Sequence, residues 1–415
     1  MTTIKKGGVF LKKFLVLFMA VLIALLPIVG MAEGVSLTMG SWRADDVEQM
    51  NNLLSIYKEK TGVDITFQPT NPSDYNATLN LQLEGGTGPD LMYSRSYATG
   101  LELFNAGHAG DCTDIPGLHE NFTELNLAPW ATEDGKMFAV PFAAVSHGVY
   151  YNKDVFAANN IEIPATFEEL LAACETLKTA GITPFANGVA EEWDILECFF
   201  LGMLPNYVGG AENRAKYESG ELKMNDENFV AALGDIGKMA PYLPTGFEAV
   251  TYNDSQILFA TGKAAMFMDG SWTSGTYGDV EFEWGVFALP APEGKATAIC
   301  FHPDLAITYN TATAHPDECK AFLEWLCSEE GVTAAVANLP AGYYPLSNFS
   351  VTFTDEHANE FLALNEGKET DARFVWPTLM DLYAPMNQAV IQVLKGAMTA
   401  QEAGDSIVAA FDALQ

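Results

Sequence analysis

Hydrophobic residues follow two spacings that alternate along the chain, and this alternation predicts an α/β protein. Residues 35–40 form an apolar run typical of a strand, and Val63, Ile65 and Phe67 alternate as a second strand. Between them lies a predicted helix whose buried face consists of Val47, Met50, Leu53, Leu54 and Tyr57. Two strands joined by a helix pair in parallel, so this order predicts a parallel sheet.

A third short strand is predicted at residues 90–93, and polar side chains follow its end. Ser94 and Arg95 come directly after this strand. Ligands collect beyond the carboxyl ends of the strands in open α/β sheets. Position alone therefore makes both residues candidates for ligand binding, with an ordinary solvated loop as the alternative.

Two further apolar runs predict strands with special roles. Residues 136–151 form a run long enough to pass from one domain to another. Residues 264–268 predict a short buried strand that ends at the turn dipeptide Asp269-Gly270, with Trp272 just beyond. An indole in this place can stack one face on a ligand in a cleft, or it can cap the local core.

Other patterns mark the remaining elements. Thr166-Phe-Glu-Glu169 and Thr399-Ala-Gln-Glu402 are capping boxes, and each predicts the start of a helix. Strands are expected at residues 281–289 and 305–309, and a helix is expected after Pro316.

The first 32 residues have the pattern of a signal peptide. Four lysines form a basic region, residues 14–29 are apolar, and Gly30-Met31-Ala32 suits a cleavage site, so we expect the cut after Ala32. No cysteine lies near this site, which excludes lipid attachment there. No second membrane-spanning segment is predicted.

The remainder of the 415-residue chain is long enough for two domains, each with its own core. It is strongly acidic: the full chain has 21 basic and 54 acidic residues and a net charge of −33. Such a charge repels phosphate backbones and therefore argues against nucleic-acid binding. With 49% hydrophobic and 12% aromatic residues, the chain is expected to fold.

Neither disulfide pairs nor catalytic motifs are evident. The 6 cysteines include no CxxC pair, and Cys319 and Cys327 lie about 12 Å apart on one predicted helix, so we expect buried free thiols. The 6 histidines include no i, i+4 pair, which predicts that the chain has no structural metal site. Motifs of zinc hydrolases, serine hydrolases and phosphate-binding loops are absent.

Several segments occur in an order that resembles the family 1 extracellular solute-binding proteins, the maltose-binding-protein-like receptors of ABC sugar importers. These segments are Leu83–Tyr93, Gly135–Phe142, Val149–Asp154, Pro164–Leu170, Gly262–Trp272, Phe322–Gly331 and Gly396–Ile407. The Gly262–Trp272 segment is the most diagnostic one.

The resemblance implies a two-lobe periplasmic-binding-protein fold of type II. Each lobe would be a mainly parallel sheet flanked by helices, and several strands would form the hinge. Lobe 1 would comprise residues 33–145 and 301–342, and lobe 2 would comprise residues 146–300 and 343–415.

The resemblance also implies which residues bind the ligand. Trp272 matches the stacking aromatic residue of the family, and Trp193 lies where the second lobe supplies another ring. Ser94 and Arg95 match a polar loop of the first lobe. The other predicted ligand-binding residues are Trp42, Arg43, His147, Tyr151, Asp269, His302, Asp304, Tyr343, Tyr344, Trp376 and Tyr383.

The function implied by this resemblance is that of an exported receptor, in the periplasm or at the cell surface. It would capture a carbohydrate and deliver it to the permease subunits of an ABC transporter, as a monomer without cofactor or catalysis. Aromatic rings suit the C–H faces of a sugar, and polar side chains suit its hydroxyls. Two alternatives remain open: the same fold with a non-sugar polar solute such as a polyamine, and a secreted carbohydrate-active enzyme.

Overall fold

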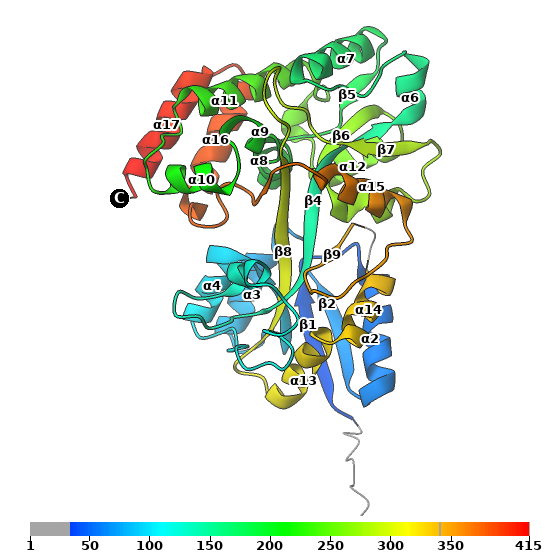
Figure 1. Ribbon diagram of the computed structural model, residues 1–415, viewed down its shortest axis with the longest axis vertical. Helices are drawn as coiled ribbons and strands as arrows, with labels where there is room; N and C mark the ends of the chain where they lie inside the picture. The colour runs from blue at the N-terminus through cyan, green and yellow to red at the C-terminus, as the bar shows by residue number, and fades with distance from the viewer. Residues whose placement is uncertain (1–33, 340–341, 415) are drawn as a thin grey trace, which may run out of the picture.

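A computed structural model describes residues 34–339 and 342–414, and it has two lobes joined by long strands (Figure 1). The predicted signal peptide at residues 1–32 lies outside the described residues. Strands β4 (Val140–Asn152) and β8 (Ile299–Tyr309) both run from one lobe into the other. The expected strand between domains is therefore confirmed, and so is the two-lobe α/β fold.

Lobe 1 is built on the predicted parallel sheet. Strands β2 (Asp64–Pro69), β1 (Ser36–Ser41) and β3 (Leu91–Arg95) lie side by side in parallel, and β8 pairs antiparallel with β3. The helices of this lobe are α2 (Val47–Thr61), α3 (Tyr75–Glu84), α4 (Tyr97–Asn105), α5 (Glu124–Leu127), α13 (Pro316–Leu326) and α14 (Glu329–Asn338).

The first helix shows why these elements form. Met50, Leu53, Leu54 and Tyr57 are the buried residues of α2, as their spacing predicts, but Val47 in the first turn is 37% exposed and its predicted burial is wrong. The helix ends at Gly62, whose φ of 79° is a left-handed conformation that glycine adopts without strain.

Lobe 2 combines a small sheet with most of the helices. Strands β6 (Ala264–Gly270) and β7 (Trp284–Phe287) pair antiparallel with β4, and β5 (Thr183–Phe185) pairs parallel with β6. Its helices are α6 (Lys153–Ala158), α7 (Phe167–Thr179), the π-helix η2 (Asp194–Phe200), α8 (Leu201–Met203), α9 (Pro205–Val208), α10 (Ala211–Glu218), α11 (Glu227–Met239), α12 (Tyr252–Ala260), α15 (Glu356–Asn365), α16 (Tyr383–Leu394) and α17 (Ala400–Asp412).

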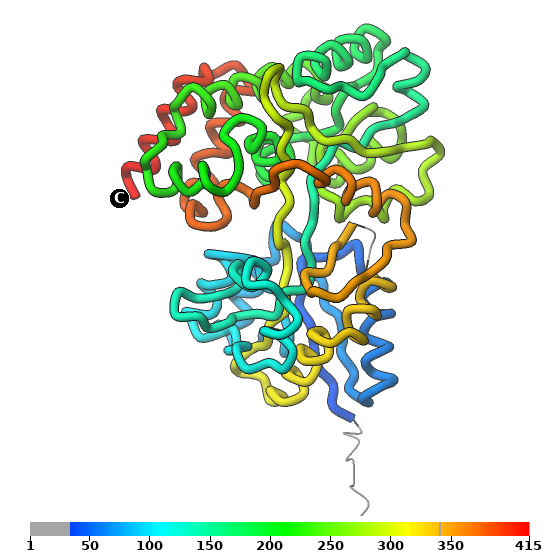
Figure 2. Tube along the Cα trace, viewed as in Figure 1, coloured from blue at the N-terminus to red at the C-terminus, as the bar shows by residue number. Residues whose placement is uncertain are grey.

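The hinge lies where β4 changes its partner. Residues 140–146 of β4 pair with β8, and residues 147–151 pair with β6. A third crossing, which Figure 2 traces in orange, includes β9 (Tyr344–Pro345), and β9 pairs with Ala143 and Ala144 of β4. The predicted lobe boundaries at residues 145 and 300 fall within β4 and β8.

Some predicted details differ from the structure. Asp269-Gly270 does not end the strand, because both residues continue β6 and pair with Gly148 and His147 of β4. The strand expected at residues 281–289 is limited to β7. Strand β8 begins six residues before the predicted start at Leu305.

Local predictions about caps and cysteines are largely confirmed. The capping box at Thr399 and Glu402 is complete, whereas Glu169 accepts from the backbone N–H of Ala165 while Thr166 caps the helix. All six cysteines are free and buried. Within residues 34–339 and 342–414, no helix is both long and apolar enough to cross a lipid bilayer.

Candidate functional site

A cavity of about 520 Å³ lies between the lobes. It takes residues from loops at the strand ends of lobe 1, from β8 and from helical segments of lobe 2. Its lining is formed by Trp42, Arg43, Pro72, Ser73, Asn76, Arg95, Ser96, Thr99, Ala190, Glu191, Glu192, Trp193, Glu197, Trp272, Asp304, Tyr343, Arg373, Trp376, Met380 and Tyr383. Aromatic and charged side chains thus face a common space of the size that small-molecule ligands occupy.

On the lobe 1 side, Trp42 carries Arg95 on its ring. The rings of Tyr75 and Tyr93 meet Trp42 edge to face, with centroids 5.5 and 5.2 Å away, and Trp42 is only 4% exposed. The guanidinium carbon of Arg95 lies 3.8 Å from the Trp42 ring centroid. One face of this indole is therefore covered by a cation, so Trp42 positions Arg95 beside the cavity.

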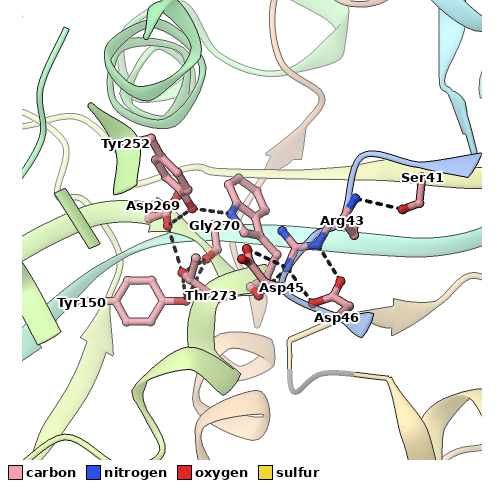
Figure 3. A network of polar contacts seen from close by, with 10 residues as sticks. Ser41, Arg43, Asp45, Asp46, Tyr150, Tyr252, Asp269, Gly270 and Thr273 are labelled. Atoms are coloured by element: carbon pink, nitrogen blue, oxygen red, sulfur yellow. Dashed lines mark hydrogen bonds and ion pairs between the residues drawn. The ribbon is translucent and has the colours of Figure 1, made fainter. Parts of the chain in front are cut away.

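Arg43 links the two lobes on the hinge side of the cavity (Figure 3). Its Nε and Nη2 donate to the two carboxylate oxygens of Asp46 over 2.5 and 2.8 Å. Nη2 also donates to the backbone carbonyl of Trp272 over 3.4 Å. Because the bidentate pair fixes the guanidinium, Arg43 is a rigid contact between β1 and the loop after β6.

On the lobe 2 side, a buried chain of hydrogen bonds fixes Trp272 (Figure 3). The indole Nε1 of Trp272 donates to the Tyr252 hydroxyl over 2.9 Å, and this hydroxyl donates to Asp269 over 2.8 Å. Asp269 also accepts from Thr273 and Cys198. The Tyr252 ring contacts Trp193, with centroids 3.8 Å apart. Asp269 thereby orients two cavity indoles through one tyrosine.

A second arginine lies between two indoles of lobe 2. The guanidinium carbon of Arg373 lies 4.5 Å from the Trp376 ring centroid and 5.3 Å from the Trp272 ring centroid. Arg373 forms an ion pair with Glu197 of η2. Burial opposes its charge, but the carboxylate of Glu197 more than compensates, and the pKa of Arg373 is raised.

Arg95 differs from the other two cavity arginines. Burial lowers the pKa of Arg95, and Asp304 and Glu197 act against this effect from a distance. Its guanidinium forms no ion pair with the described part of the chain, so its N–H groups remain available to a ligand. Burial raises the pKa of Asp304, yet His302, Arg373 and Arg95 lower it to about 2, which keeps this carboxylate ionised.

The structure brings many of the predicted site residues together. Those that line the cavity are Trp42, Arg43, Arg95, Trp193, Trp272, Asp304, Tyr343, Trp376 and Tyr383. Two cavity rings are more buried than the sequence suggests, since Trp272 and Trp376 are each 6% exposed, whereas Trp193 is partly buried.

Three predicted residues lie beneath the cavity wall and do not line it. Asp269 is fully buried and supports Tyr252 as described above. The ring of His147 lies behind Trp272 with centroids 5.3 Å apart, and the ring of His302 lies behind Trp376 with centroids 5.1 Å apart. All three side chains therefore lie behind aromatic residues, and those in front of the two histidines line the cavity.

Three other predicted residues lie outside the cavity because of local contacts. Of Ser94 and Arg95, which were predicted together, Ser94 is the buried residue, and its hydroxyl donates to the Arg95 carbonyl. Tyr151 packs on Phe156 and Phe287 within lobe 2. Tyr344 donates its hydroxyl to the Ala358 carbonyl at the third crossing. None of the three lines the cavity.

Sequence reasoning missed the lobe 2 charges and most of the small polar contacts. The missed residues with polar or charged side chains are Ser73, Asn76, Ser96, Thr99, Glu191, Glu192, Glu197 and Arg373. A signal was present for Arg373, because the chain has few arginines and, apart from Arg214, all of them line the cavity.

A family model of the bacterial extracellular solute-binding proteins matches residues 40–333. The chain belongs to this family. The match covers both lobes and includes β4, β6 and β8, which together form the hinge and the floor of the cavity.

Relatives of this solute-binding protein include receptors with named ligands. The multiple sugar-binding protein of Streptococcus mutans is 24% identical over 386 residues, which cover 85% of this chain and 88% of the relative. The maltodextrin-binding protein of Bacillus subtilis is 24% identical, with 72% of this chain and 70% of the relative covered. These relatives are binding proteins rather than enzymes.

Solved structures share its fold. A chitin oligosaccharide binding protein aligns with a TM-score of 0.79 and 21% identity over 92% of this chain and 99% of that chain. A binding protein in complex with raffinose aligns with a TM-score of 0.75 and 19% identity over 92% and 100% of the two chains.

Proposed function

We propose that this solute-binding protein captures a neutral carbohydrate in the interlobe cavity and delivers it to the permease subunits of an ABC transporter. The observation that carries the proposal is the composition of the cavity: indole and phenol rings from both lobes surround a few polar groups with fixed positions. Such a site suits a molecule with apolar faces and a hydroxyl rim. The sugar-binding relatives in the family support the same ligand class.

Three groups supply the polar contacts in this proposal. Arg95 offers unpaired N–H donors from lobe 1, and Ser73 and Asn76 lie on the same side. Asp304 offers an ionised carboxylate from β8. Because hydroxyls both donate and accept, a sugar edge satisfies a donor and an acceptor that face the same space.

The charges of the cavity favour a neutral ligand. Its lining contains Arg43, Arg95 and Arg373 against Glu191, Glu192, Glu197 and Asp304, so positive and negative charges nearly balance. A polyamine requires several free carboxylates without nearby arginines, and this lining argues against it. An acidic sugar would approach Asp304 and the glutamates at an electrostatic cost.

Binding without chemical conversion is part of the proposal. Hydrolysis of a glycosidic bond needs a carboxylic acid that is protonated near neutral pH. The pKa of Asp304 is about 2, so this carboxylate, which faces the cavity from β8, is not suited to that role. We propose a monomeric receptor, exported to the periplasm or the cell surface, that binds no nucleic acid.

The proposal is tested by thermal melting with a panel of neutral mono- and oligosaccharides, uronic acids and spermidine. A neutral saccharide at about 100 times its dissociation constant should stabilise the protein by roughly 2.7 kcal/mol, and scattering should show a more compact shape. Stabilisation by spermidine or uronic acids alone would contradict the ligand class. Release of products from a bound saccharide would contradict the absence of catalysis.

A further inference from the structure

A second cluster of chemically competent side chains lies behind the cavity wall. His147 of β4 and Cys300 and His302 of β8 each direct one potential metal-ligand atom to a common point, and these atoms all lie within 4.8 Å of one another. The side chains come from two neighbouring strands, and all three are buried, with His147 the most exposed at 2%. The sequence prediction of no metal site considered only spacing along helices, and it did not consider side chains that two strands bring together.

One distance within the cluster is close to that between two ligand atoms of a tetrahedral metal centre. Sγ of Cys300 lies 3.8 Å from Nδ1 of His302. Zinc bonds of 2.3 Å to sulfur and 2.0–2.1 Å to nitrogen at a tetrahedral angle place these two ligand atoms about 3.5 Å apart. A small inward movement of either side chain would thus complete the geometry.

A carboxylate lies near the outer nitrogen of His302, where metal-bound histidines often have a hydrogen-bond partner. Nε2 of His302 lies 3.4 Å from Oδ1 of Asp304, on the opposite side of the ring from Cys300. A carboxylate in this position fixes the ring orientation and the tautomer of a metal-bound histidine. Asp304 would therefore serve both the sugar cavity and the cluster.

The ring nitrogens of His147 are otherwise unexplained. Neither nitrogen has a hydrogen-bond partner among the described residues, although buried polar atoms are normally satisfied. His147 is only 2% exposed, so both ring nitrogens lie away from solvent. A neutral imidazole is the form that binds a transition metal.

We propose that His147, Cys300 and His302 form a binding site for a thiophilic divalent transition-metal ion of the Zn²⁺ type. Mixed nitrogen and thiolate ligands select such ions over Mg²⁺ or Ca²⁺. Arg373 opposes the ion, but it is paired with Glu197, and Asp304 places a carboxylate beside His302. Binding releases the thiol proton and strengthens as pH rises.

The position of the site gives it a consequence for the lobes. β4 and β8 both cross the hinge, and a metal ion would tie His147 of one strand to Cys300 and His302 of the other. The two histidine rings contact Trp272 and Trp376 edge to face. An ion at this point would therefore fix the two histidine rings against which Trp272 and Trp376 pack.

Titration of untagged, chelator-treated protein with Co²⁺ tests the proposal independently of any sugar. We expect one Co²⁺ per chain, a thiolate-to-cobalt absorption band in the near ultraviolet, and loss of the band when Zn²⁺ is added. Cys300→Ser should abolish the band. Cys174→Ala, which removes a buried free thiol of α7, should keep it.

Absence of the band in the wild-type protein, or its persistence in Cys300→Ser, would overturn the site. If near-ultraviolet circular dichroism shows that Cys300→Ser does not fold, His147→Gln supplies the test, because it keeps the thiolate but should weaken Co²⁺ binding. Unchanged Co²⁺ affinity in His147→Gln would also overturn the site. Asp304→Asn should weaken Co²⁺ binding roughly 10- to 100-fold through the orientation of His302.

Discussion

The two sides of the cavity use the same pair of residue types in different ways. In lobe 1, Arg95 lies on Trp42 and has no ion-pair partner in the described part of the chain. In lobe 2, Arg373 lies between Trp376 and Trp272 and is paired with Glu197. One side therefore offers a donor that a ligand can engage, and the other has its charge fixed before any ligand arrives.

The support beneath the two sides differs as well. Trp42 is held by ring contacts with Tyr75 and Tyr93. Trp272 is held by the hydrogen bonds of Tyr252 and Asp269. Edge-to-face ring contacts tolerate small shifts of the ring, whereas a buried hydrogen-bond chain specifies one orientation more strictly. We infer that lobe 2 supplies a preorganised binding surface, the Trp272 ring, and that lobe 1 supplies a more adjustable contact, Arg95 on the Trp42 ring.

The largest difference between the two sides should appear on removal of each arginine. Arg373→Ala leaves the partly buried Glu197 without its ion-pair partner and should lower the free energy of unfolding by about 2–3 kcal/mol. Arg95→Ala removes a cation–π contact and should cost only about 1 kcal/mol of stability while it weakens sugar binding. Urea denaturation measures the free energy of unfolding of both variants. Equal losses of stability would refute the distinction between a fixed and an available arginine.

The next effect concerns buried carboxyl groups of lobe 2. Burial raises the pKa of Asp194 to about 7 and that of Asp269 to about 6, above the unfolded value of about 4. The folded state therefore binds more protons between pH 4 and pH 7, and the contribution of these groups to stability falls as pH rises through that window. Asp194→Asn, which cannot titrate, should flatten the pH dependence of the urea midpoint.

Asp304 provides the control with the opposite sign. Its pKa of about 2 lies below the unfolded value, so its contribution is present above pH 4 and is lost as pH falls toward 2. Asp304→Asn should therefore reduce the loss of stability in acid and leave the slope between pH 5 and pH 7 nearly unchanged. The same slope in wild type and Asp194→Asn would show that the buried carboxyl of lobe 2 does not titrate in this range.

Removal of the Trp272 ring should weaken ligand binding. Trp272→Ala is expected to weaken saccharide binding by about 2–3 kcal/mol, because large aromatic residues at the centre of a binding site contribute most. Trp284→Ala is the matched control: Trp284 is 4% exposed against 6% for Trp272, and it stacks on His357 outside the cavity. Calorimetric titration should show a loss of affinity for the first variant and little change for the second.

The parts of this protein that the sequence predicts well are those with local causes. Helix α2 follows from its periodic apolar face, and the cap at Thr399 follows from the pairing of Thr399 with Glu402. Strand β4 follows from a long apolar run. In these cases, residues within a few positions of one another decide the structure.

The parts that the sequence predicts poorly depend on contacts between distant segments. Asp269 looks like a turn residue, but pairing with β4 extends the strand and buries the carboxylate. His147 and His302 lie behind the rings of Trp272 and Trp376, and both contacts join segments that are far apart in the sequence. Arg373 comes to the cavity from a late segment, and its partner Glu197 lies far earlier in the chain. Such pairings are defined only by the assembled fold.

The smallest predicted effect concerns the hydrogen bonds that orient Trp272 in lobe 2. Tyr252→Phe removes the hydroxyl that joins Trp272 to Asp269, and it should lower the free energy of unfolding by about 1–2 kcal/mol, because both partners are buried. Affinity for the saccharide should also fall, since the Trp272 ring loses its fixed orientation. Tyr344→Phe removes one buried hydrogen bond outside the cavity, to the Ala358 carbonyl, and should cost similar stability without loss of affinity. If both variants bind the saccharide equally well, ring packing alone orients Trp272, and the two sides of the cavity are supported in the same way.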